Sequence, residues 1–213
     1  MGKFFKTCLG ADQPRQYSLS DAPQREWLRI SVKREAAHGD ALPLGRVSTL
    51  LHDGVEVGAI VELTAPMGDF TLAREATAPV MMISAGVGIT PMVSMASTLA
   101  ATDSRRPIRF VHACRSTRTH AFRVWLNELV ATYPDAKRLV AYEQVGPGDV
   151  PGVDHDLEGR LTAERLRPML MPDADYYLCG PVAFMAAQRD ALVGLGVPGE
   201  RIHSEVFGSG VLS

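Results

Sequence analysis

The chain divides into two stretches with different patterns of hydrophobic and polar residues. In the first stretch apolar residues mostly occupy every second position, as in residues 26–33 and 59–64, which predicts strands with one face in a core. A short helix is predicted between them, over residues 45–52. Short strands, one small helix and frequent turn residues are typical of a small antiparallel barrel, which we expect for residues 1–74.

Continuous runs of apolar residues characterise the second stretch, residues 75–213. Residues 80–84 are apolar or small throughout, which predicts a strand buried on both faces of a parallel sheet. Further strands are predicted at 108–113, 138–141, 176–178 and 201–206, and helices at 91–100, 121–131, 163–169 and 182–195. Successive strand-helix units predict a doubly wound parallel sheet, with ligands at the carboxyl ends of its strands.

A glycine-containing turn follows the first buried strand. In Ala85-Gly86-Val87-Gly88-Ile89-Thr90-Pro91 two glycines lack the Cβ atoms that would keep a phosphate away from the main chain. Thr90 and Pro91 suit an N-cap and a first helical position, so the helix would direct its amides at an anion. The stretch predicts a phosphate cradle. Taken alone it is also compatible with an ordinary strand-helix turn, because Pro91 replaces the third glycine of the full dinucleotide fingerprint.

Two polar groups of residues stand out earlier in the chain. Arg15 and Tyr17 share one face of a strand, where a guanidinium can hold a phosphate and a phenol ring can stack on a flat heteroaromatic ring. The helix start at Gly45-Arg46-Val47-Ser48 offers amides and a hydroxyl to a second phosphate. The alternatives are an exposed strand in the first case and a plain helix cap in the second.

Composition limits the classes of protein to consider. The 213 residues carry a net charge of −2 with scattered basic residues, which disfavours a nucleic-acid partner, and no apolar run is long enough to cross a membrane. Three cysteines, Cys8, Cys114 and Cys179, lack CxxC spacing, so we expect no disulfide framework, zinc site or iron–sulfur cluster, and a reducing, cytoplasmic location. The six histidines show no metal-ligand spacing, and we expect no metal: His38, His52, His112, His120, His155 and His203.

The motifs together resemble a known family. Six stretches occur in the order and approximate spacing of ferredoxin-NADP reductase-like flavoproteins. Three are described above, and the other three are Ala65 to Phe70, which precedes the glycine turn, and Cys179-Gly180-Pro181 and Glu205-Val206-Phe207-Gly208, which follow it. More narrowly, RQYSLSDAP, ISVKRE, PDADYYLCGP and IHSEVFG resemble the reductase part of bacterial flavohaemoglobins, the nitric oxide dioxygenases. The resemblance extends from about Pro14 to Gly208. It implies an FAD-binding barrel followed by an NAD(P)H-binding domain.

The resemblance assigns residues of the first domain to FAD. It implies that Arg15 binds the pyrophosphate, that Tyr17 stacks on the isoalloxazine ring, and that Ser18 bonds near the reactive N5 atom. Ser48 and the amides around it would hold the other side of the FAD pyrophosphate. The remaining FAD-binding residues expected here are Gln16, Gly45 and Val47.

The resemblance assigns residues of the second domain to the nicotinamide cofactor and the flavin ring. It implies that Cys179 and the turn Gly180-Pro181 lie at the nicotinamide, and that Glu205 and Phe207 lie by the flavin, where Phe207 covers the face that the nicotinamide must reach. Ser18, Cys179 and Glu205 are the expected catalytic residues. Val206 and Gly208 complete the expected cofactor contacts, and the pyrophosphate cradle comprises Ala85, Gly86, Val87, Gly88, Ile89 and Thr90.

The resemblance implies hydride transfer from NAD(P)H to FAD and single-electron transfer onward to a haem globin or another redox partner. Arg115 and Arg118 could meet the 2′-phosphate of NADPH, or form a solvated loop, whereas the resemblance favours NADH. Residues 145–156 are interpreted as a flexible connection.

Two features of the chain keep alternatives open. No residues correspond to a globin, and only fourteen residues precede Arg15, so we expect the first barrel strand to be missing. One alternative is a truncated, inactive fragment that binds a nucleotide or a partner. The other is a reductase that serves an oxygenase or a ferredoxin-like acceptor.

Overall fold

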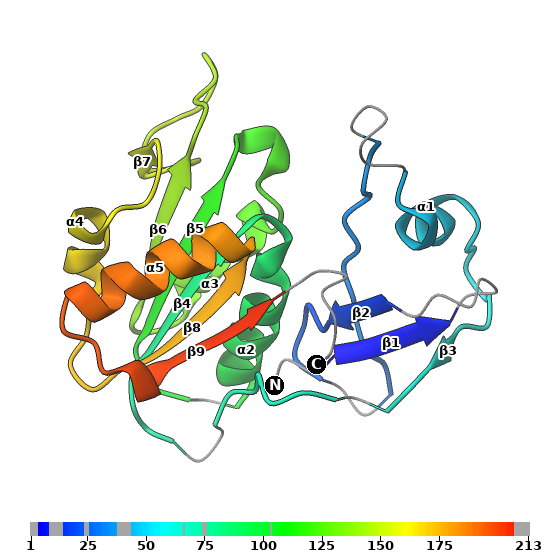
Figure 1. Ribbon diagram of the computed structural model, residues 1–213, viewed down its shortest axis with the longest axis horizontal. Coiled ribbons are helices and arrows are strands. Elements are labelled where there is room, and N and C mark those ends of the chain that lie inside the picture. Colours follow the sequence, from blue (N-terminus) through cyan, green and yellow to red (C-terminus); the bar gives the residue numbers. More distant parts are fainter. Residues whose placement is uncertain are drawn as a thin grey trace.

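The computed structural model describes residues 4–8, 15–23, 26–37, 44–65, 67–73, 76–102 and 104–206. It has two parts, a large sheet covered by helices and a smaller N-terminal sheet beside it (Figure 1). The large sheet contains six strands in the order β7-β6-β5-β4-β8-β9, and every neighbouring pair is parallel. Its strands are β4 (Val80–Ala85), β5 (Ile108–Cys114), β6 (Ala136–Tyr142), β7 (Leu157–Glu158), β8 (Asp175–Gly180) and β9 (Ile202–Val206).

Helices cover both faces of the large sheet, as the sequence predicts. Helices α2 (Ile89–Ala101) and α3 (Arg123–Thr132) pack on one face, and α4 (Ala163–Leu166) and α5 (Val182–Gly194) on the other (Figure 1). The helix predicted over 163–169 is divided into α4 and the 3₁₀ helix η4 (Arg167–Met169), because Pro168 lacks the N–H that a continuing α-helix needs. The other 3₁₀ helices are η2 (Gly86–Gly88), η3 (Thr117–Thr119) and η5 (Gly199–Arg201).

The apolar run of β4 is explained by burial on both faces. Met82 packs with residues of α2 and α3, whereas Met81 and Ile83 pack with residues of α4 and α5, and all three are fully buried. Each such side chain contributes about 1.5–3 kcal/mol on burial. The strand therefore lies at the centre of the sheet, and its carboxyl end lies between those of β5 and β8.

The N-terminal part is a smaller antiparallel sheet in the order β2-β1-β3, beside helix α1 (Arg46–Asp53). Its strands are β1 (Phe4–Cys8), β2 (Arg15–Ser18) and β3 (Glu62–Leu63). The prediction of a strand over 26–33 is wrong: only Ile30 pairs, in an isolated bridge with Leu19, while Trp27 and Leu28 are exposed. The strand predicted over 59–64 shortens to β3.

The two parts meet along α2 and the start of the large sheet. Ser94 Oγ, on α2, donates a hydrogen bond of 2.8 Å to the Asp21 carbonyl. Phe70 packs its ring against Tyr177 of β8, with centroids 5.7 Å apart. The boundary predicted between residues 74 and 75 lies outside the described residues, and Arg106 binds the chain on both sides of it, at the carbonyls of Ala73 and Ala78.

Candidate functional site

The turn between β4 and α2 exposes its main chain to solvent at the carboxyl edge of the sheet. Gly86 has φ +54° and is exposed, and nothing lies within 4 Å of the position that a Cβ atom would occupy. At Gly88 the opposite holds, because an added Cβ would lie 2.3 Å from the carbonyl oxygen of Cys179. One glycine therefore leaves room for a ligand and the other lets the turn pack on β8, which is the geometry that a pyrophosphate cradle needs.

Thr90 is not the N-cap that the sequence predicts. The helix begins at Ile89 with Gly88 as its N-cap, and the buried hydroxyl of Thr90 donates to the Val87 carbonyl at 3.1 Å. This hydroxyl therefore stabilises the turn through a hydrogen bond within it. A phosphate at this position would meet the main chain of the turn and the positive end of the helix dipole.

The start of α1 resembles the start of α2 in using its hydroxyl internally. Ser48 Oγ donates to the Gly45 carbonyl at 3.0 Å and accepts from the Glu35 amide at 3.2 Å. Val47 and Ser48 are both buried, and Gly45 is the N-cap. This helix start can offer a phosphate its main-chain amides, and the placement of FAD there remains a prediction.

Strand β2 carries the residues that the resemblance assigns to FAD. Arg15 and Gln16 are exposed, Tyr17 is half-buried and Ser18 is buried. Burial raises the pKa of Tyr17, and the charge of Arg15 partly offsets this rise. Ser18 Oγ is buried without a hydrogen-bond partner among the described residues. A hydroxyl left in this state suits a polar ligand atom, and these residues are therefore compatible with FAD.

Cys179 and Glu205 are paired residues on β8 and β9, so their side chains share one face of the sheet. Burial, reinforced by the charge of Glu205, raises the pKa of the fully buried Cys179 thiol well above its usual range. The thiol therefore stays protonated and neutral. The catalytic role expected for Cys179 stays a prediction, and the neutral thiol would act there through contact and not through charge.

Glu205 lies at the interface between the two parts. Burial raises its pKa to about 8, and the charge of Asp69, from the N-terminal part, adds to the rise. Glu205 Oε2 has no hydrogen-bond partner among the described residues. A carboxyl group that holds a proton near neutral pH and has a free oxygen is suited to bind or exchange a proton with a ligand.

The remaining predicted residues are placed as follows. Gly180 is buried against Ala85 and Phe184, with little room for a side chain. Pro181 is the exposed N-cap of α5, and Val206 ends β9 half-exposed. Phe207 and Gly208 lie outside the described residues.

The parallel topology brings the carboxyl ends of β4, β5, β8 and β9 to one edge, as predicted. Arg115 and Arg118 are exposed in the loop after β5. Residues 145–156, interpreted as flexible, are held by hydrogen bonds: Asp149 accepts from Gly146 at 2.7 Å, and Asp154 accepts from Val150 at 2.8 Å.

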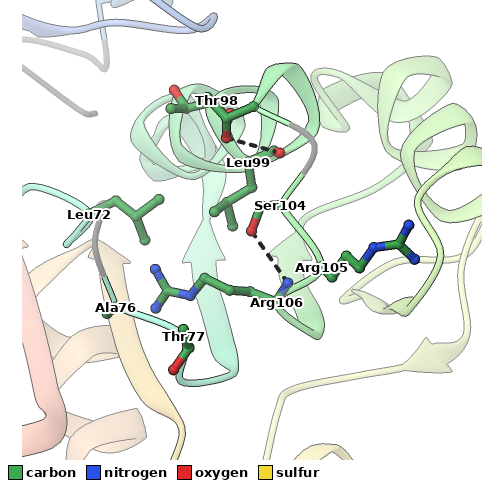
Figure 2. A pocket seen from close by; sticks show the side chains of 9 residues that line it. Leu72, Ala76, Thr77, Thr98, Leu99, Ser104, Arg105 and Arg106 are labelled. Atoms are coloured by element: carbon green, nitrogen blue, oxygen red, sulfur yellow. Dashed lines mark hydrogen bonds between the residues drawn. The ribbon is translucent and has the colours of Figure 1, made fainter.

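A cavity of about 560 Å³ lies at the other edge of the sheet, where β4 and β5 begin (Figure 2). Arg106 borders it and is 5% exposed; its Nε and Nη1 atoms are used by main-chain carbonyls and its Nη2 atom lies 3.6 Å from Asp175. This arginine holds the connection between the two parts. The cavity is remote from every residue that the sequence analysis assigned to a cofactor.

Sequence reasoning missed a buried polar group beneath the carboxyl edge. His112, His120 and His155 are all at least nine-tenths buried and stack with one another or with Tyr142. The one sequence signal for this group was His112, which interrupts the apolar run of β5. Among the described residues no cluster of three or more histidine, cysteine or acidic side chains could hold a metal ion, and none of the described helices is both long and apolar enough to cross a membrane.

Comparison with known proteins agrees with this geometry. The profile described as "Oxidoreductase NAD-binding domain" matches residues 82–190. The flavohemoprotein of Bordetella pertussis is 52% identical over 204 residues, which are 95% of this chain and 50% of that protein. The flavohemoprotein of Chromobacterium violaceum is 53% identical over 209 residues, 97% of this chain and 51% of that protein. The chain thus spans about half the length of these curated relatives.

Solved structures show the same relationship. The flavohem-like FAD/NAD-binding domain of nitric oxide dioxygenase from Vibrio cholerae is 38% identical, with a TM-score of 0.81, and the match covers 97% of this chain and 84% of that one. The cytochrome b5 reductase domain of Ulva prolifera nitrate reductase is 21% identical with a TM-score of 0.81, over 96% of this chain and 84% of that one, and it shares the fold.

Proposed function

The chain belongs to the flavohemoprotein family of FAD/NAD-binding domains, and from that premise we propose that it is an NAD(P)H:flavin oxidoreductase that passes electrons to a haem or another one-electron acceptor. One observation carries the proposal. Ser18 and Glu205, from the two parts of the molecule, each hold a buried oxygen without a partner among the described residues, and the open glycine turn lies on the same sheet as Glu205. When bound, FAD supplies the ring that accepts the hydride and releases single electrons.

The residues of the chain position and shield the two cofactors. With FAD bound, Tyr17 would cover one face of the flavin, Ser18 would offer its hydroxyl to the ring, and Arg15 would neutralise the pyrophosphate. Glu205 keeps a proton near neutral pH at the interface, because burial holds its pKa at about 8. The neutral Cys179 thiol would place no charge beside a bound nicotinamide.

The glycine turn supports a nicotinamide coenzyme, and we place NADH ahead of NADPH. Residues Ala85 to Thr90 would hold the pyrophosphate through the main chain, and Gly180-Pro181 would shape the nicotinamide end. Arg115 and Arg118 are the side chains that an adenosine 2′-phosphate would meet. The rates of flavin reduction by NADH and by NADPH, measured under identical conditions, show which coenzyme is preferred.

The electron acceptor is proposed from the relatives. Flavohemoproteins match this chain over about half their length, so a haem domain is the acceptor that we favour over an oxygenase or a ferredoxin-like protein. Cys114 and Cys179 are free, buried thiols, which supports a reducing, cytoplasmic location. We also propose that the FAD-binding part ends near residue 74.

The experiment is flavin loading followed by anaerobic reduction. Purified protein is mixed with excess FAD, unbound FAD is removed, and the visible spectrum is recorded before and after NADH. A retained flavin band that bleaches supports the proposal. Absence of retained flavin, or a retained band that does not bleach, contradicts it and favours the inactive nucleotide- or partner-binding fragment.

A matched pair of serine variants tests the role of the N-terminal residues. Ser18→Ala removes a hydroxyl without a partner among the described residues, whereas Ser20→Ala removes a buried hydroxyl that already bonds Ser31 Oγ at 2.9 Å. We expect flavin reduction by NADH to slow by roughly tenfold or more in Ser18→Ala only, consistent with the loss of one preorganised donor. If NADH reduced the flavin at equal rates in the two variants, Ser18 would not belong to the flavin site.

A further inference from the structure

A line of polar side chains runs through the core directly beneath the carboxyl edge of the large sheet. Ser84, the residue before the last one in β4, places its Oγ 2.9 Å from His112 Nδ1 on the neighbouring strand. The His112 ring stacks on His120, with centroids 5.2 Å apart. Ser84 and His112 are fully buried and His120 is 7% exposed. The line therefore begins two residues before the exposed Gly86.

The line continues to the loops that follow β5 and β6. His120 Nδ1 lies 2.8 Å from the Tyr142 hydroxyl. Burial raises the pKa of this hydroxyl, and hydrogen bonding by the Thr117 side chain partly offsets the rise, so Thr117 lies next to the same group. The Thr117 hydroxyl in turn donates to the carboxylate of Asp149. Because Thr117 follows β5 and Asp149 follows β6, the line joins two loops to each other and to the strand that ends in the glycine turn.

The carboxylate fixes the direction of these hydrogen bonds. Hydrogen bonding from Thr117 and Gly146 holds the pKa of Asp149 below its usual value, so this group only accepts. Thr117 gives its single proton to Asp149, so its oxygen can only accept from any further partner. The line therefore ends at a carboxylate that fixes the direction of its last hydrogen bond.

This connection is costly for a purely structural element. Tyr142 belongs to the same buried cluster as Met82, Phe110, Val140 and Leu126, whose side chains pack without polar atoms. Three ring nitrogens, His112 Nε2, His120 Nε2 and His155 Nδ1, are buried without partners among the described residues. Apolar side chains would fill the same space without leaving polar atoms unpaired.

The position of the line matches one half of the nucleotide. The glycine turn marks the pyrophosphate, and Cys179 and Glu205, on β8 and β9, mark the nicotinamide side nearest the N-terminal sheet (Figure 1). A dinucleotide extends to both sides of its pyrophosphate, so its adenosine half lies over β5 and β6. The loops above these strands are the ones that the buried line holds.

We propose that Ser84, His112, His120, Tyr142 and Thr117 are positioning residues for the adenosine half of NAD(P)H. They hold the loops after β5 and β6 in place relative to the glycine turn, from beneath, without touching the nucleotide. The inference rests on the nucleotide part of the proposed function and is independent of flavin and of the acceptor.

Two tyrosine variants test the inference, with ADP as the probe and isothermal titration calorimetry as the measurement. Tyr142→Phe removes the hydroxyl that joins His120 to Thr117. Tyr133→Phe is the control: Tyr133 belongs to the same buried cluster, and its hydroxyl donates to the Arg106 carbonyl at 2.9 Å near the opposite edge. We expect ADP to bind roughly three- to tenfold more weakly to Tyr142→Phe and unchanged to Tyr133→Phe.

A second variant and a second readout separate positioning from stability. Thr117→Val keeps the shape of the side chain and breaks the same line, so it should weaken ADP binding as Tyr142→Phe does. In FAD-loaded protein, KM for NADH should rise in both variants by the factor seen with ADP, while kcat stays unchanged. KM for reduced nicotinamide mononucleotide, which lacks the adenosine half, should not change.

Three outcomes would overturn the inference. ADP affinity unchanged in Tyr142→Phe and Thr117→Val would show that the line does not position the loops. An equal loss in Tyr133→Phe would reduce the effect to general destabilisation. Failure of the unaltered protein to bind ADP would contradict the nucleotide site itself, whereas ADP binding without flavin reduction would contradict the proposed function and leave this inference standing.

Discussion

The two sheets differ in how much of their own apolar surface they bury. In the large sheet Val80, Met81, Met82 and Ile83 are all 0% exposed. In the N-terminal part Ile60 is 94% exposed, and Val57, Leu63 and Trp27 are also among its exposed large apolar residues. The large sheet has helices on both faces, whereas the described part of the N-terminal sheet has three short strands and a single helix.

This difference indicates where stability resides. A parallel sheet covered on both faces is stable through its own core, whereas a small open sheet gains stability from whatever binds it. The large sheet should therefore unfold as one cooperative unit, and the N-terminal sheet should respond to FAD.

The largest effect is expected from a core truncation. Phe110, on β5, is fully buried and packs edge-on against Trp125, so Phe110→Ala should destabilise the protein by about 3–5 kcal/mol. Ile60→Ala, in the N-terminal part, should change stability by less than about 0.5 kcal/mol because the side chain is already in solvent. Urea denaturation followed by circular dichroism measures both. Similar losses of stability in the two variants would contradict the difference between the two sheets.

A second effect concerns the glycine turn. A Cβ at Gly88 would lie within 2.7 Å of three main-chain atoms of Cys179 and Gly180, none of which can rotate away. Gly88→Ala should therefore cost about 2–4 kcal/mol and abolish ADP binding. Gly148→Ala is the matched control, since nothing lies within 4 Å of its Cβ position. Normal ADP affinity in Gly88→Ala would show that the turn and β8 need not pack so closely.

A third effect is acid sensitivity of the large sheet. Burial lowers the pKa of His112 to about 3 and that of His120 to about 4, so both are neutral in the folded protein. The unfolded chain takes up these protons near pH 6.5, and stability is therefore present above that pH and lost as the pH falls toward 3–4.

Urea titrations at pH 7 and pH 5 measure this loss. His112 alone should account for on the order of 2 kcal/mol between the two values. His112→Asn should reduce the difference by about that amount. A pH dependence identical to that of the unaltered protein would mean that His112 is charged in the folded state.

The smallest effect is expected at the interface. The folded pKa of Glu205 is raised to about 8, so its contribution to stability is fully present below about pH 4.5 and is lost as the pH rises through 8. Glu205→Gln cannot ionise and should be more stable than the unaltered protein at pH 9, by about 1 kcal/mol after solvent screening, but not at pH 5. Thermal melts at the two pH values would contradict this if the difference stayed constant.

The sequence predicted the large sheet well because the relevant signals are local. The uninterrupted run at 80–84 became β4, and Gly86 and Gly88 lie where a strand meets a helix, as expected. The pattern at 26–33 misled because alternation requires a neighbouring strand, and among the described residues only Ile30 finds one. Alternation describes a segment, whereas a sheet depends on its partner.

Side-chain direction and long-range contacts were beyond the sequence. The hydrogen bonds of the Ser48 hydroxyl to the Gly45 carbonyl and the Glu35 amide could not be predicted, and its expected contact with a phosphate stays a prediction. His112, His120 and His155 looked unrelated because they have no common spacing, and the parallel sheet and its loops bring them together. Pairings of this kind appear only when the register of the strands is known.

Helix α2 has a practical consequence for protein engineering. It starts at the glycine turn and, one turn further on, holds the N-terminal part through Ser94 and the Asp21 carbonyl. A chimaera cut at the connection near residue 75 would therefore separate two surfaces that bond to each other. To exchange coenzyme preference between relatives, α2 should be transplanted together with the segment around Asp21. The hydrogen bond between Ser94 and the Asp21 carbonyl is then kept.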